Sequence, residues 1–150
     1  SLDFCLNKLI PEMFPQGMET LQQEKARGAT VLLVTASPSF YLAPLENLLG
    51  IEDVIGTRMN ADETGHFTGD ICGDNCKGVQ KPLRLAEYLA AKGDSLDFDT
   101  SSAYGDSGSD LPMMQLCQTK VGVNPRRKLK KALKSEEGAK QVRWKGKEKK

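Results

Sequence analysis

The stretch "TVLLVTAS" (residues 30–37) is a continuous run of mostly apolar and β-branched residues that ends in small polar ones. Such a run is typical of a strand buried on both faces, as in a parallel sheet covered by helices. The segment "GMETLQQEKAR" (17–27) has a helical composition, and "SFYLAPLENLLG" (39–50) has a helical pattern that ends at Gly50. The order helix, strand, helix therefore predicts part of an α/β domain.

The same alternation continues towards the C-terminus. A short strand is predicted at 52–59 and a β-hairpin or extended arm at 60–74, before a helix with an apolar stripe at 78–93. Two further strand-then-helix pairs follow: strands 100–106 and 119–124, with helices 109–117 and 125–134. Strands alternating with helices predict a doubly wound, mostly parallel, Rossmann-like α/β sheet with helices on both faces.

Length and composition narrow the class of protein. A chain of 150 residues with 39% hydrophobic content is enough for one globular domain. No apolar run approaches the roughly 20 residues that span a bilayer, and no segment has the flanks of a signal peptide. The four cysteines do not form a dense disulfide framework, which favours free thiols in a reducing compartment. We therefore expect a cytoplasmic protein.

The net charge of +1 hides an asymmetry along the chain. Residues 1–119 contain 8 Lys and Arg against 17 Asp and Glu, a net charge of −9, whereas residues 120–150 contain 13 against 3, a net charge of +10. A basic end can contact nucleic acid or an anionic membrane. Because Trp144 is the only aromatic residue in it, we expect a solvated helix and a disordered basic tail at 145–150, with neither nucleic acid nor membrane as partner.

Polar residues follow two of the predicted strands. Thr35 ends "VLLVT", and Asp106 and Asp110 lie four apart in "YGDSGSDLPMM" (104–114). In parallel α/β sheets the ligand lies beyond the carboxyl ends of the strands. Two carboxylates at the start of a helix are, by themselves, more simply explained as caps. The additional hydroxyl favours a site for phosphate and a hard cation such as Mg²⁺.

A lysine on the predicted helix 78–93 completes the set. Lys81 would supply positive charge to phosphate oxygens, and Lys77, one helical turn earlier, is the alternative. The register of the helix, which ends at Gly93, favours Lys81. A hydroxyl, a lysine and two carboxylates in this order predict phosphate chemistry that is assisted by Mg²⁺.

From about Phe14 to Trp144, these residues resemble the haloacid dehalogenase superfamily of phosphotransferases, in its phosphoserine-phosphatase-like branch. The resemblance implies that Asp106 ligates Mg²⁺, and that Asp110 holds a metal-bound water or orients the loop. It also implies phosphate-binding roles for Thr35, Ala36 and Lys81.

The first motif of that family is missing. No apolar strand followed by D-x-D-x-T occurs, and the early Asp3 in "SLDFCLNK" has no second aspartate two residues on. We therefore expect a fragment that consists of a helical-cap remnant at 1–13, an incomplete core at 14–144 and the tail. In the family fold the missing strand is central, between the strand that ends at Thr35 and the strand that ends at Asp106. It would come from the parent protein or a second chain, unless the remaining strands close up.

The resemblance implies that the parent protein is a Mg²⁺-dependent phosphatase. It would hydrolyse a small phosphorylated metabolite through an aspartyl-phosphate intermediate. The chain described here would contribute Thr35, Lys81, Asp106 and Asp110 and would be inactive by itself. The alternative is a non-catalytic binding or interaction module on the same scaffold. The substrate stays open, because the cap that selects it in this family is largely missing.

Overall fold

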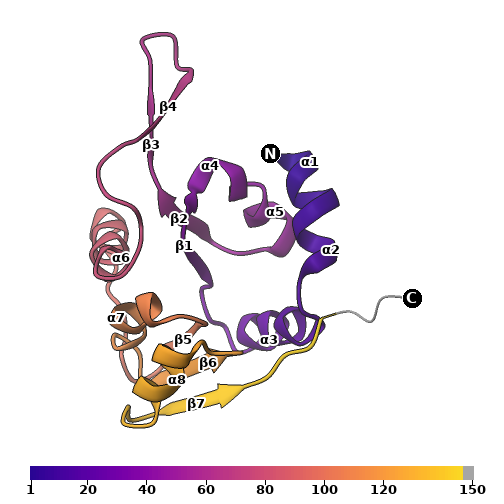
Figure 1. Cartoon of the computed structure of the whole chain (residues 1–150), viewed down its shortest axis with the longest axis vertical. Helices are drawn as coiled ribbons and strands as arrows, with labels where there is room; N and C mark the ends of the chain where they lie inside the picture. Colours follow the sequence, from indigo (N-terminus) through magenta and orange to yellow (C-terminus); the bar gives the residue numbers. More distant parts are fainter. Residues whose placement is uncertain (147–150) are drawn as a thin grey trace. The chain divides into compact units, whose positions relative to one another are not determined.

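The structure is a computed structural model that describes residues 1–146 (Figure 1). The chain divides into two compact units, Ser1–Cys76 with the segment from Lys145 onward, and Lys77–Trp144. Each unit is described by itself. Most of the predicted basic tail, residues 147–150, lies outside the described residues.

The first unit begins with a short run of helix. α1 (Leu2–Phe4), the π-helix η1 (Cys5–Leu9) and α2 (Ile10–Glu12) follow one another with helical backbone angles at the junctions. The run stops at Met13, which is extended, and α3 (Pro15–Ala26) starts with proline in its first turn, where the missing N–H is tolerated. Gly28, with φ +85°, follows α3 and supplies the left-handed conformation that ends a helix.

Two parallel strands, β1 (Leu32–Pro38) and β2 (Asp53–Thr57), form the sheet of this unit. The crossover between them contains α4 (Ser39–Leu42) and α5 (Leu45–Leu49) rather than the single helix predicted for 39–50. The prediction of one continuous helix was wrong: Pro44, expected in a first helical turn, stands at the start of α5, and α4 before it is separate because Pro44 has no N–H to continue the helical hydrogen bonds. Gly50, with φ +67°, ends α5 as predicted.

β1 is half-buried, with two exposed residues near its end, so the prediction of burial on both faces was also wrong. Within the described residues, β1 has a strand neighbour on one edge only, which leaves it less covered than a central strand. Regular pairing with β2 is interrupted between Val34 and Pro38. β1 therefore continues beyond Thr35, but its regular pairing with β2 stops at Val34.

The predicted hairpin is present. β3 (Met59–Ala61) and β4 (Phe67–Ile71) pair antiparallel, and this arm extends away from β1 and β2 (Figure 1). In its turn, the side chain of Asp62 accepts hydrogen bonds from Thr64 and from the backbone N–H of His66. These bonds, led by that of the Thr64 hydroxyl, hold the pKa of Asp62 below its usual value.

The core of the first unit includes the N-terminal helices. Cys5, Leu45, Ile51 and Val54 form a buried cluster. Cys5 is completely buried, and its thiol donates to the carbonyl of Tyr41 at 3.2 Å. The segment predicted as a cap remnant thus packs into the same core as the crossover between β1 and β2.

The second unit starts with α6 (Gln80–Ala91) and contains three parallel strands, β5 (Ser102–Gly105), β6 (Thr119–Val123) and β7 (Ala139–Val142). The 3-10 helix η2 (Gly108–Asp110) and α7 (Leu111–Met114) follow β5, and α8 (Arg127–Leu133) connects β6 to β7. Strand β7 was not predicted, because "AKQV" carries two exposed polar residues and no strong apolar pattern.

The core of the second unit lies between the sheet and the helices α7 and α8. Its buried residues are Ala103, Met114, Cys117, Leu129 and Leu133. Burial raises the pKa of the Cys117 thiol above its ordinary value, as expected for a cysteine in an apolar core.

In the described part of the chain, β1 pairs only with β2, and β5 pairs only with β6. The result is an α/β fold made of parallel sheets and helices, as predicted. No helix among the described residues is both long and apolar enough to cross a membrane.

Candidate functional site

The loop that follows β5, residues 106–110, is called the Asp106 loop below. It starts from Gly105, where a Cβ would lie 2.7 Å from the Cβ and 2.8 Å from Oδ2 of Asp110. Only glycine, which has no Cβ, lets the main chain at residue 105 lie this close to the side chain of Asp110. The close approach brings the carboxylate of Asp110 under the first peptides of the loop.

Asp110 is buried and organises the loop. Its Oδ2 accepts hydrogen bonds from the backbone N–H groups of Asp106 (3.1 Å) and Ser107 (3.2 Å). Its Oδ1 accepts a hydrogen bond from Nζ of Lys81 at 2.5 Å, in an ion pair with both side chains more than nine-tenths buried. The carboxylate thus joins the loop to helix α6.

The electrostatics of this pair favour an ionised carboxylate. Burial by itself raises the pKa of Asp110, but the hydrogen bond and charge of Lys81 and the two backbone N–H groups together lower it below the ordinary value. At neutral pH Asp110 is therefore a carboxylate that compensates a buried ammonium group.

Asp106 differs from Asp110 in both exposure and contacts. Its side chain is exposed and, among the described residues, has no hydrogen-bond or ion-pair partner. Its carbonyl accepts a hydrogen bond from the backbone N–H of Arg126 at 2.8 Å. The main chain is therefore held while the carboxylate is free to bind a cation.

The segment after β6 contacts the Asp106 loop through the backbone N–H of Arg126, and Asn124 stands at its start. Asn124 has a φ of +45°, which is uncommon for a residue other than glycine. Its side chain donates to the carbonyl of Trp144 (2.9 Å) and accepts from the Trp144 N–H (2.8 Å). From the sequence, the position of Asn124 at the end of a strand suggests a contact with the loop that would bind Mg²⁺, but both of these side-chain hydrogen bonds go to Trp144 instead.

Lys81 and Lys77 are clearly distinguished by the structure. Lys81 lies in the first turn of α6, is 8% exposed and pairs with Asp110. Lys77 precedes the helix and is exposed. Of the two, Lys81 is the lysine that the fold brings to the Asp106 loop.

Thr35 and Ala36 belong to the first unit. The Thr35 hydroxyl oxygen accepts a hydrogen bond from the N–H of Ser37 at 3.1 Å. The carbonyl of Ala36 accepts from the hydroxyl of Thr57 at 2.6 Å. Thr57, which is 1% exposed, also accepts a hydrogen bond from the N–H of Cys76 at 3.0 Å, a structural role that its sequence context does not indicate.

The residues present fit part of a Mg²⁺ site. Among residues 1–146, no group of three or more His, Cys, Asp or Glu side chains is arranged to hold a metal ion. Mg²⁺ commonly takes one or two protein carboxylates and fills the other positions with water and substrate phosphate. Asp106 is suited to be one such ligand, whereas the carboxylate of Asp110 is already occupied by Lys81 and two N–H groups.

Comparison with known proteins gives consistent results. Histidinol-phosphatase from Neisseria meningitidis is 30% identical over 133 residues, which cover 88% of this chain and 60% of that protein. The crystal structure of a protein of unknown function from Bordetella pertussis superposes with a TM-score of 0.83 at 28% identity, covering 93% of this chain and 62% of the other.

A substrate-bound phosphoserine phosphatase has the same fold, with a TM-score of 0.61 at 24% identity, over 76% of this chain and 53% of that one. The chain spans 60% of the length of the histidinol-phosphatase, the curated relative described above. A family model described as haloacid dehalogenase-like hydrolase matches residues 3–115. The predicted resemblance is confirmed, and the chain belongs to the haloacid dehalogenase-like hydrolase family.

Proposed function

We propose that this chain is part of a Mg²⁺-dependent phosphatase that hydrolyses a small phosphomonoester through an aspartyl-phosphate intermediate. The observation that carries the proposal is the exposed carboxylate of Asp106, which has no partner among the described residues and follows a strand directly. The buried pair of Lys81 and Asp110 fixes the loop on which this carboxylate stands. Membership of a hydrolase family with a relative named as a phosphatase supports it.

Asp106, Asp110 and Lys81 have distinct roles in the proposal. Asp106 is the protein ligand of the metal, and Mg²⁺, when bound, neutralises charge on the phosphoryl group. Asp110 orients the loop through its bonds to two N–H groups and contacts the metal only through water. Lys81 is held in place by Asp110 and supplies positive charge to the phosphate.

Thr35 and Ala36 are proposed to bind the phosphate by hydrogen bonds. The Thr35 hydroxyl accepts from Ser37, which leaves its own hydrogen available to a phosphate oxygen. Ala36 is exposed, and the bond from Thr57 to its carbonyl fixes the peptide that follows. These are neutral donors, whereas Lys81 carries a charge.

The nucleophile of the proposed reaction is an aspartate outside these 150 residues. Covalent catalysis by a carboxylate divides hydrolysis into two displacements. As the resemblance to the family implies, this aspartate ends a further strand of the parent protein. The free cysteines are in keeping with a cytoplasmic protein.

The test compares this chain with the protein encoded when the reading frame is followed upstream of Ser1. The longer protein should contain an apolar strand with D-x-D-x-T or D-x-D-x-S and should hydrolyse p-nitrophenyl phosphate only with Mg²⁺. Asp106→Asn in it should lower kcat/KM by at least about a hundredfold. Asp94→Asn, at another exposed aspartate, should leave the rate unchanged.

Two outcomes contradict the proposal. Turnover by the purified 150-residue chain alone would show that no outside nucleophile is needed. A start codon directly before Ser1 would instead support the non-catalytic module.

A further inference from the structure

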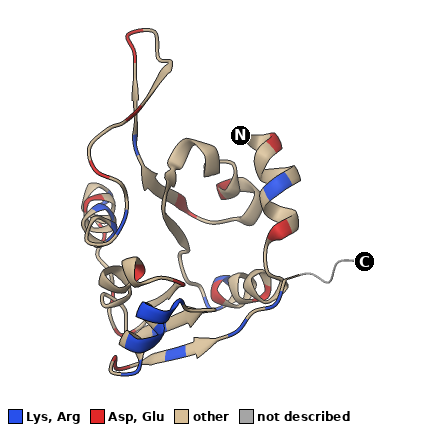
Figure 2. Cartoon of the chain, in the orientation of Figure 1, with Lys and Arg blue, Asp and Glu red and all other residues tan. Residues whose placement is uncertain are grey.

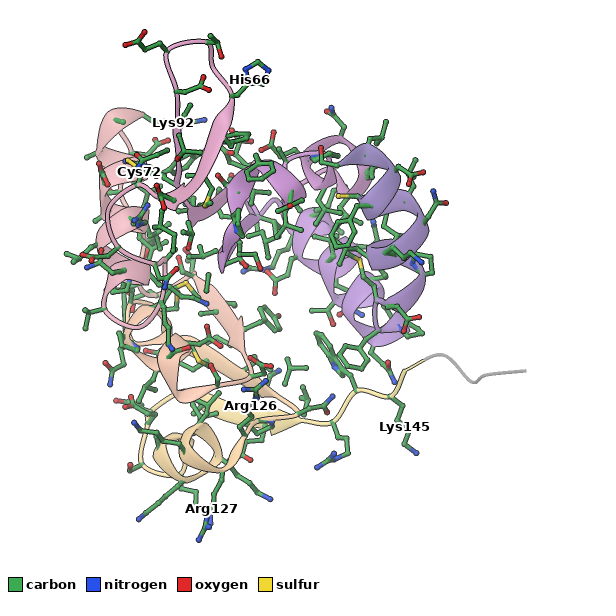
Figure 3. All side chains as sticks on the ribbon, turned by 45° about the horizontal axis from the view of Figure 1, so that its top comes forward. His66, Cys72, Lys92, Arg126, Arg127 and Lys145 are labelled. Atoms are coloured by element: carbon green, nitrogen blue, oxygen red, sulfur yellow. The ribbon has the colours of Figure 1, made fainter. Side chains whose placement is uncertain are left out.

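Eight basic residues in and beside α8 and β7 of the second unit are exposed. We call this set the cationic face, and it consists of Arg126, Arg127, Lys128, Lys130, Lys131, Lys134, Lys140 and Arg143. Figure 2 shows α8 as the largest concentration of basic residues on the ribbon. Figure 3 labels Arg126 and Arg127 at its start, and the Arg127 side chain points away from the ribbon.

The charges of the cationic face are not compensated within the described residues, where no carboxylate forms an ion pair with any of them. Arg127 and Lys131 are four apart on α8, and Lys131 and Lys134 are three apart. Like charges at these spacings repel one another and destabilise a helix. The helix forms despite this repulsion because its inner residues Leu129 and Leu133 are buried in the core. An anion bound to this face would relieve the repulsion.

The cationic face contains a hollow of about 190 Å³ between α8 and β7. Lys130 and Arg143 line it, together with Pro125, Gln141 and Val142. The Gln141 side chain donates to the carbonyl of Lys130 at 3.1 Å, which fixes the strand against the helix. An arginine fork beside a lysine in a concave surface is suited to the oxygens of a phosphate group.

The composition of the cationic face limits the classes of partner that it can bind. None of the exposed large apolar side chains falls within 120–146, so this face has nothing to insert into a bilayer. Trp144 is half-buried, with its ring centroid 6.4 Å from that of Tyr104, so it offers no open platform for stacking an unpaired base. Backbone contacts to a duplex, in contrast, need only Lys and Arg.

We propose that the cationic face binds the phosphodiester backbone of double-stranded nucleic acid without reading its sequence. The sequence contained no aromatic residues interleaved with the basic ones, which argued against nucleic acid. The absence of interleaved aromatic residues argues only against base stacking. In favour of backbone binding, the structure adds the exposure of all eight basic residues and the hollow that two of them line. The proposal uses none of the residues assigned to phosphate hydrolysis.

The test is fluorescence anisotropy of a labelled, mixed-sequence DNA duplex of about 20 base pairs, titrated with the 150-residue chain between about 50 and 200 mM NaCl. Binding should reach a Kd of about 1–100 μM near physiological salt and weaken steeply as salt rises. Replacing two phosphate-contacting cations should weaken binding and make the slope of log K against log salt shallower by about 2. The variants are Arg127→Gln with Lys131→Gln for the helix, and Lys130→Gln with Arg143→Gln for the hollow.

Two control variants locate the effect. Lys8→Gln with Lys92→Gln removes two exposed cations outside the cationic face and should leave affinity and slope unchanged. Substituting Lys147, Lys149 and Lys150 by Gln tests the tail and should reduce affinity less than either pair on the cationic face. Unchanged circular dichroism spectra verify that each variant is folded.

Any one of four results would overturn the proposal. They are no binding at about 50 mM NaCl, equal losses in the control and face variants, binding to a single strand as tight as to the duplex, and preferential binding to phosphatidylcholine vesicles that contain phosphatidylserine. The last would assign the face to a membrane instead.

Discussion

The two regions that carry the predicted site residues are built in different ways. In the first unit, the end of β1 is held by neutral hydrogen bonds: the Thr57 hydroxyl donates to Ala36 and accepts from Cys76. In the second unit, the Asp106 loop after β5 is held by a buried charge, because the carboxylate of Asp110 binds Lys81 and two N–H groups. The residues proposed to bind phosphate are thus supported by uncharged contacts in one unit and by an ion pair in the other.

The difference determines how each region should respond to change. A neutral hydrogen bond contributes about 0.5–1.5 kcal/mol and does not titrate near neutral pH. A buried ion pair contributes little net stability, but removing one partner is costly, because the other charge is left in a poorly solvated place. We therefore expect substitutions in the two regions to lower the free energy of unfolding by different amounts.

The largest effect is expected from Asp110→Ala. It leaves the buried ammonium group of Lys81 without its carboxylate and should lower the free energy of unfolding by about 3–5 kcal/mol in urea titrations. The double variant Lys81→Met with Asp110→Leu removes both charges and should recover most of the loss. A double variant as unstable as Asp110→Ala would show that the charge is not the cause.

Acid should produce a smaller version of the same loss. The pKa of Asp110 is below its model-compound value of 3.8 in the folded chain, so its contribution to stability is fully present above pH 3.8. That contribution is lost as the pH falls below 3.8 through the folded-state pKa. Urea titrations over this range should show a pH-dependent component that is absent in Asp110→Ala. Identical pH profiles would contradict the assignment.

Two glycines test the close packing of the two regions. A Cβ at Gly56 would lie 2.7 Å from the Ser37 carbonyl and 2.9 Å from the Ser39 nitrogen, both backbone atoms, whereas at Gly105 it meets the side chain of Asp110. Alanine at either position should lower the free energy of unfolding by about 1–3 kcal/mol. The loss should be larger at Gly56, because backbone atoms can move aside less easily than a side chain. Gly146→Ala, with open surroundings, is the control. Equal stability of the three variants would contradict these contacts.

Thr57→Val should cost about 1–3 kcal/mol, because the Ala36 carbonyl and the Cys76 N–H lose their partner at a buried position. The shape of the side chain is retained, so packing contributes little. Thr68→Val, at an exposed threonine of β4, is the matched control and should be close to neutral. A similar loss in both variants would point to the change of side chain rather than to the buried hydrogen bonds.

The smallest effect is expected from Asp106→Asn. Because its side chain is exposed and has no partner among the described residues, stability should change by no more than about 0.5 kcal/mol. This variant would show that Asp110 serves the structure and Asp106 is available for a ligand. A loss as large as that of Asp110→Ala would remove this distinction.

The fold was largely predictable from local pattern. The helix at 78–93 was predicted from its apolar stripe and its glycine stop. The strands at 52–59, 100–106 and 119–124 were predicted from composition and from their alternation with helices, and each segment contains the element observed there. The errors occurred where one residue or a tertiary contact overrides pattern: Pro44 divides a helix, and β7 forms against β6 with few apolar residues of its own. Local pattern does not contain the partner strand that stabilises such a segment.

The sequence by itself determined the residue types and their order: a hydroxyl after one strand, a lysine on a helix and two aspartates after another strand. The sequence could not assign different roles to the two aspartates, since both are carboxylates at the start of a helix. Only the tertiary structure distinguishes them, because it buries Asp110 against Lys81 and leaves Asp106 exposed. The physical reason is that the burial and the charge compensation of Asp110 depend on Lys81 of α6. Lys81 is 29 residues from Asp110 in the sequence and contacts it only in the folded chain.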